Sequence, residues 1–141
     1  MQRQRQTLMS FTSQSLRVLM IASHDNQTRH LLAVLRASRT PRFEVVHAAN
    51  GSEALRLVME AQPEVVLLDM NMPVLDGEGF IAAVRERGLR IPIVIMTAGS
   101  SAKRWASQLG ADAYLSKPFE LANLVDVTNR FATTMNAADD N

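Results

Sequence analysis

Short apolar runs alternate along this chain with segments whose apolar residues recur every three or four positions. Each run is too short for a helix and is mostly β-branched or aliphatic, which is typical of buried strands. The runs lie at 18–22, 45–46, 65–68, 93–96 and 113–115. Helical spacing follows each of them, at 31–35, 54–58, 80–84, 102–109 and 121–128. The pattern therefore predicts five strands, each followed by a helix.

Turn-forming residues separate the predicted elements, because they stand where one element should stop and the next begin. They are Asn50-Gly51, Gln62-Pro63, Asp76-Gly77, Gly88 and Gly110. Strict alternation with almost uninterrupted apolar central strands predicts a parallel sheet that carries helices on both faces. Right-handed crossovers should connect its strands. The expected fold class is α/β, with a single doubly wound (βα)5 unit and no internal repeat.

Length and composition are those of a one-domain protein. A chain of 141 residues with 47% hydrophobic content can bury one core and is short for two domains. We expect a flexible arm at 1–15, a folded domain at 16–135 and a tail at 136–141. No apolar run approaches the roughly 18 residues of a membrane span, and the first residues lack the apolar stretch of a secretory signal.

Charge and cysteine content narrow the function classes. The chain has no cysteine, which agrees with a reducing compartment and excludes thiol nucleophiles and thiolate metal sites. Its net charge is +1, with no basic cluster that would neutralise a run of phosphates. We therefore expect a cytoplasmic protein that binds neither membranes nor, by this chain alone, nucleic acid.

Polar residues follow four of the predicted strands, at the edge where a sheet of this kind places its site. They are Ser23-His24-Asp25, residues 69–73, Thr97-Ala98 and Ser116-Lys117-Pro118. Asp69 offers a carboxylate nucleophile, Thr97 a hydroxyl donor and Lys117 a positive charge. Together they suit the acceptance of a phosphoryl group, whose oxygens need hydrogen bonds and counter-charge during the attack. An aspartate that only caps a helix or turn is the alternative interpretation of Asp69.

Three sequence segments span the carboxyl ends of the third, fourth and fifth predicted strands. In chain order they are LLDMNMPVLDG, IPIVIMTA and GADAYLSKPF. With these segments the chain resembles the receiver domain of two-component response regulators, over residues 17 to about 135. For this fold we expect a five-stranded parallel sheet in flavodoxin-like order 2-1-3-4-5. Helices one and five should lie on one face, and helices two, three and four on the other.

The resemblance also implies roles for individual residues. Asp69 would be the phosphoacceptor, while Thr97, Ala98 and Lys117 would contact the phosphoryl group. Mg2+ would be the cofactor, held by Asp69 and by the backbone carbonyl of Asn71. The phosphodonor would be a histidine kinase or a phosphotransfer protein.

A second set of implied roles concerns signal output. Thr97 and Tyr114 match the family's switch residues, and Lys117-Pro118 matches its cis peptide bond. Trp105 is a candidate partner-binding anchor on the fourth helix, although packing at the margin of the core is an equally good interpretation. We expect partners, and a homodimer if one forms, to use the fourth helix, the fifth strand and the fifth helix.

The sequence departs from the family pattern where a metal would bind. Receivers usually carry two adjacent acidic residues after the first strand, and Ser23 and His24 occupy those positions here. Because Mg2+ prefers carboxylate oxygens, its affinity should be weakened unless Asp25 replaces one acid. A protonated His24 could instead supply positive charge, although a solvated loop residue is the simpler interpretation. Only twelve residues separate Thr97 from Gly110, so the fourth helix or the loop before it should be short.

Three function classes remain open from the sequence. The first is a stand-alone response regulator that accepts a phosphoryl group and signals through protein–protein contact, and that is not a metabolic enzyme. The second is a degenerate receiver that binds partners without phosphorylation, which Ser23 and His24 favour. The third is a phosphohydrolase with an aspartate nucleophile, which would need an acid where Asn71 stands. We therefore rank the third class last.

Overall fold

Five parallel strands form one sheet in the order β2-β1-β3-β4-β5. They are β1 (Ser15–Ile21), β2 (Arg42–Ala48), β3 (Val65–Asp69), β4 (Ile93–Ala98) and β5 (Ala113–Lys117). The computed structural model describes residues 15–39, 42–70, 72 and 77–139. Every strand pair within these residues is parallel, so the predicted sheet and its flavodoxin-like order are confirmed.

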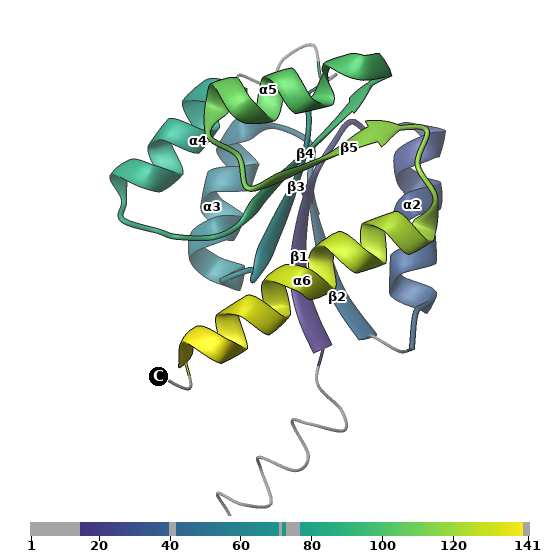
Figure 1. Cartoon of the computed structure of the whole chain (residues 1–141), viewed down its shortest axis with the longest axis horizontal. Coiled ribbons are helices and arrows are strands. Elements are labelled where there is room, and N and C mark those ends of the chain that lie inside the picture. The colour runs from purple at the N-terminus through teal and green to yellow at the C-terminus, as the bar shows by residue number, and fades with distance from the viewer. Residues whose placement is uncertain (1–14, 40–41, 71, 73–76, 140–141) are drawn as a thin grey trace, which may run out of the picture.

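Five α-helices connect and cover the strands. They are α2 (Asn26–Ala37), α3 (Gly51–Ala61), α4 (Gly77–Glu86), α5 (Ala102–Leu109) and α6 (Leu121–Asp139), with a 3-10 turn η1 (Gly99–Ser101) before α5. Figure 1 shows α2 and α6 on one side of the sheet and α3, α4 and α5 on the other, as predicted. No helix in the described part of the chain is long and apolar enough to cross a membrane.

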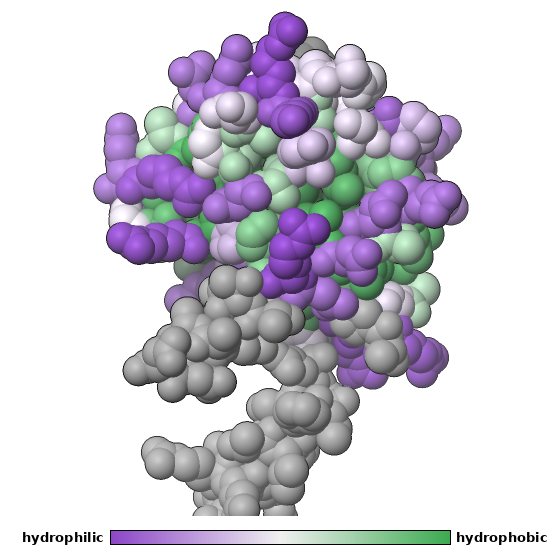
Figure 2. Space-filling model, viewed as in Figure 1, coloured by the Kyte–Doolittle hydropathy of each residue, from purple (hydrophilic) through white to green (hydrophobic). Residues whose placement is uncertain are grey.

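Two apolar layers hold the helices against the sheet. Alternate residues of the central strand β3 enter opposite layers, with Leu67 in the layer under α2 and α6 and Leu68 in the layer under α3 and α4. All five residues of β3 are buried, which explains the uninterrupted apolar run in the sequence. On the outside, polar side chains lie across the described part of the face seen in Figure 2, with apolar ones between them.

Several elements differ in length from the sequence-based expectation. β2 spans 7 residues rather than the two of its apolar run, because it is an edge strand whose polar residues alternate with buried ones. β1 begins at Ser15, before the first apolar run at 18–22. α6 extends to Asp139, beyond the predicted helical segment 121–128. The expected shortening before Gly110 is confirmed, since α5 has only 8 residues.

Candidate functional site

The carboxyl ends of the three strands β3, β4 and β5 meet at one edge of the sheet. Asp69, the last residue of β3, pairs in the ladder with Met96 of β4. Lys117, the last residue of β5, pairs with Ala98 of β4. This register brings residues that are far apart in the sequence to the same edge, as the predicted topology requires.

Asp69 and Lys117 form an ion pair at this edge. The Lys117 ammonium donates a hydrogen bond from Nζ to Oδ2 of Asp69 over 2.8 Å. The Asp69 side chain is only 4% exposed and the Lys117 side chain only 11%, so water screens their charges poorly. A buried carboxylate is tolerated only when it is compensated, and Lys117 supplies this compensation. The arrangement holds a carboxylate oxygen beside a fixed positive charge at the edge of the sheet.

Thr97 and Ala98 lie at the end of β4, next to this pair. Thr97 is one residue beyond the ladder partner of Asp69, and the residue is buried, with 3% exposure. Ala98 is exposed, and its carbonyl accepts a hydrogen bond from the hydroxyl of Ser101, the last residue of η1 before α5. The peptide bond between Lys117 and Pro118 is cis, as the resemblance implied.

Asp25 caps the helix that follows β1. Its Oδ1 accepts a hydrogen bond from the Thr28 backbone N–H over 2.7 Å, at the N-terminus of α2. This bond is the main reason that the pKa of Asp25 lies below its ordinary value, and the positive charge of Lys117 adds a smaller effect. One of the two Asp25 oxygens is therefore committed to the helix cap.

One of the two residues at the positions of the missing acids, His24, packs against a second imidazole, that of His47 on β2. Ser23 is partly buried and His24 is exposed in the turn after β1. The His24 ring packs edge-to-face on the ring of His47, with centroids 4.7 Å apart and planes at 82°. His47 carries no sequence motif and was not predicted as a site residue. Its place near the end of an edge strand, beside β1, was the only signal that could have identified it.

The described part of this site contains two carboxylates that could bind Mg2+, those of Asp69 and Asp25. Asp69 is paired with Lys117, Asp25 caps α2, and Asn71 lies outside the described residues. No three His, Asp or Glu side chains among the described residues are grouped so that they could hold a metal ion. Asp69 and Asp25 are the described acidic side chains of this site, and Mg2+ bound through them would keep several water ligands.

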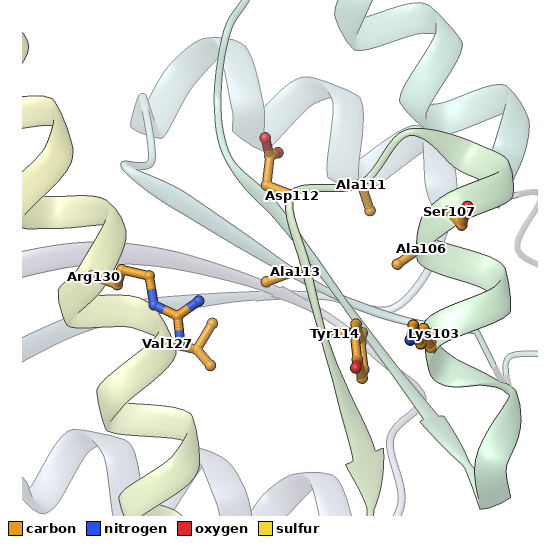
Figure 3. A pocket seen from close by; sticks show the side chains of 9 residues that line it. All are labelled: Lys103, Ala106, Ser107, Ala111, Asp112, Ala113, Tyr114, Val127 and Arg130. Atoms are coloured by element: carbon orange, nitrogen blue, oxygen red, sulfur yellow. The ribbon is translucent and has the colours of Figure 1, made fainter.

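A groove lies on the opposite side of β5 from β4, between α5 and α6. It has a volume of about 520 Å³ and is lined by Lys103, Ala106, Ser107, Ala111, Asp112, Ala113, Tyr114, Val127 and Arg130 (Figure 3). The exposed Tyr114 side chain extends from β5 towards the Lys103 side of the groove in Figure 3. The predicted switch residue Tyr114 therefore lines this groove, while Trp105 on α5 is 37% exposed.

Comparisons with known proteins agree with this geometry. Residues 18–129 match the family described as response regulator receiver domain. The transcriptional regulatory protein PrrA of Mycobacterium tuberculosis is 42% identical over 111 residues, which are 77% of this chain and 46% of that protein. The regulatory protein AtoC of Escherichia coli is 34% identical over 116 residues, which are 81% of this chain and 24% of that protein. The chain thus spans less than half the length of these relatives.

Solved structures give the same result. A response regulator from Chloroflexus aurantiacus superposes with a TM-score of 0.73 at 34% sequence identity, over 84% of this chain and 99% of that one. The fold, the strand-end arrangement and the family match cover the same part of the sequence. The chain belongs to the response regulator receiver domain family of two-component signalling.

Proposed function

We propose that this protein accepts a phosphoryl group on Asp69 from a histidine kinase or a phosphotransfer protein and passes the signal on by protein contact in the cytoplasm. The buried ion pair between Asp69 and Lys117 is the observation that carries this proposal. It provides an ionised nucleophile and a positive charge within 2.8 Å, at the sheet edge where this fold places its sites.

The transfer needs no catalytic base, because the carboxylate is already ionised. An Asp69 oxygen attacks the phosphorus of a phosphohistidine, so that a P–O bond forms while the P–N bond breaks. The leaving imidazole nitrogen keeps the electron pair and takes up a proton from solvent. Lys117 and the Thr97 hydroxyl then face the phosphoryl oxygens, together with the backbone N–H of Ala98. Fixed charges and donors of this kind stabilise the charge that develops on the transferred group.

Partners then bind the face formed by α5, β5 and α6. Thr97 is the second-last residue of β4, beside the proposed phosphoacceptor, and Tyr114 lies on the adjacent strand β5 in the groove of that face. A phosphoryl group that interacts differently with two positions of these side chains shifts the population between them. Trp105 on the same helix as Lys103 is the proposed anchor for a partner. A homodimer through this face is the corresponding proposal for self-association.

Phosphorylation can be tested with acetyl phosphate, with and without Mg2+, by intact mass spectrometry. We expect the wild type to gain the mass of one phosphoryl group and Asp69→Asn to gain none. Asp126→Asn is a matched control, because Asp126 is an exposed aspartate on α6, away from the strand ends. Modification of Asp69→Asn to the same extent as wild type would contradict the proposal.

A phosphorylation-independent binding module is the second candidate function. Ser23 and His24 support it, because they offer no carboxylate for Mg2+ at the end of β1. An absence of modification in wild type at every Mg2+ concentration, with the partner still bound, would favour this candidate over the first.

Weak Mg2+ affinity is a separate prediction from the same residues. The double variant Ser23→Asp with His24→Asp rebuilds an acidic pair, so it should bind Mg2+ at least about tenfold more tightly than the wild type. Isothermal titration calorimetry on both proteins measures this difference. Equal affinities would mean that Asp25, or another group, already completes the wild-type site.

A further inference from the structure

The contact between His24 and His47 places two imidazole rings at the same edge of the sheet as Asp69. His47 lies near the end of β2, and its Nε2 is 2.7 Å from the carbonyl oxygen of Ala22. A carbonyl oxygen only accepts, so Nε2 carries the hydrogen and donates it. In the neutral ring the lone pair is then on Nδ1. Histidines that bind metals commonly have this arrangement, with the second ring nitrogen donating to a backbone carbonyl.

The separation of the two rings fits a shared metal ion. A tetrahedral ion that holds two imidazoles through bonds of about 2.1 Å brings their ring centroids to about 5 Å. The observed separation is 4.7 Å. His47 is half-buried and oriented by Ala22, whereas His24 is exposed in a turn and can rotate its ring towards the lone pair of His47.

We propose that His24 and His47 form a binding site for a borderline transition-metal ion such as Zn2+. Imidazole nitrogen suits Zn2+, Cu2+ and Ni2+, and it is a poor ligand for Mg2+. The absence of cysteine from the chain removes thiolates as competing ligands. No third His, Asp or Glu of the described residues joins the pair, so water fills the remaining positions. The site is thus open, unlike a structural zinc site, and it does not depend on phosphoryl transfer.

Calorimetric titration with ZnCl2 tests the site with three variants. His24→Ala removes the exposed ligand. His47→Gln keeps an N–H donor that reaches the Ala22 carbonyl and removes the ring lone pair, so it preserves the packing better than alanine. His30→Ala is the matched control, because His30 is an exposed histidine on α2 and the one histidine of the chain outside the proposed site. Circular dichroism establishes that each variant is folded.

We expect wild type and His30→Ala to bind one Zn2+ per chain with equal affinity. His24→Ala and His47→Gln should each weaken binding at least tenfold, since the loss of a partner outside the ligand shell alone costs about 10–100-fold. Binding should also weaken at pH 5, because the ligand imidazoles must be deprotonated. No Zn2+ binding by wild type, or equal binding by both ligand variants and wild type, would overturn the site and leave the ring contact as packing only.

Discussion

The ion pair between Asp69 and Lys117 should contribute much more to folding than a surface ion pair of the same length. The perturbation is a double-mutant cycle with Lys117→Met, Asp69→Asn and the combined variant. Lys117→Met leaves a carboxylate that is 4% exposed without its counter-charge, and breaking a buried pair in this way costs about 3–5 kcal/mol. Because Lys117 keeps 11% exposure at the edge of the sheet, we expect the low end of this range, about 3 kcal/mol.

The other two corners of the cycle give the coupling energy. Asp69→Asn keeps an oxygen that can accept from the Lys117 ammonium, so it should cost only about 1–2 kcal/mol. The combined variant removes both charges, and its cost should be smaller than the sum of the single costs by about 2 kcal/mol. Urea unfolding followed by circular dichroism measures the free energy of unfolding at each corner.

An exposed ion pair on α3 provides the internal control. Arg56 and Glu60 also approach to 2.8 Å, yet their side chains are 57% and 59% exposed. The same cycle there, with Arg56→Met and Glu60→Gln, should give a coupling below about 0.5 kcal/mol. Equal coupling energies for the two pairs would refute the reasoning, because burial would then have no effect on the strength of the interaction.

Three further predictions concern local backbone and packing. Asp25→Ala removes the bond to Thr28 and should lower the free energy of unfolding by about 1 kcal/mol at pH 7. Because the cap depresses the pKa of Asp25, the difference in unfolding free energy between wild type and Asp25→Ala is present above pH 3.8. It narrows as the pH falls below 3.8, where Asp25 takes up a proton. Gly77→Ala places Cβ 2.8 Å from the Met70 sulfur, a flexible group, so it should be nearly neutral alone and stabilise by about 0.5 kcal/mol in Met70→Ala. Gly110→Ala should cost about 1 kcal/mol, because φ is +69° with no atom within 4 Å of the added Cβ.

Thermal and urea unfolding check each of these. Asp25→Asn should keep the cap at pH 7, and a loss as large as that of Asp25→Ala would show that charge matters more than the hydrogen bond. A cost for Gly77→Ala that Met70→Ala does not relieve would mean that the clash with the Met70 side chain is not its cause. A neutral Gly110→Ala would mean that the end of α5 rearranges at no cost.

The sequence could predict those features whose cause lies in one strand or in the order of strands. The apolar run that ends at Asp69 exists because every residue of β3 is buried, and the position of Lys117 follows from the parallel order. The extent of β2 was underestimated because an edge strand buries only alternate residues. The pairing of His24 with His47 was not predictable, because it depends on the register between β1 and β2 and on side-chain orientation in a turn.

The ion pair between Asp69 and Lys117 also depends on the order in which the strands are synthesised and join the sheet. Asp69 and Lys117 are 48 residues apart, and Lys117 comes from the last strand, which docks at the edge of the sheet. A nascent or partly unfolded chain that has formed β1, β2 and β3 therefore exposes the carboxylate without its ammonium. The reactive pair exists only once β5 has joined the sheet. Under the proposed function, a chain in which β5 has not yet joined the sheet would therefore lack the positive charge that the phosphoacceptor site needs.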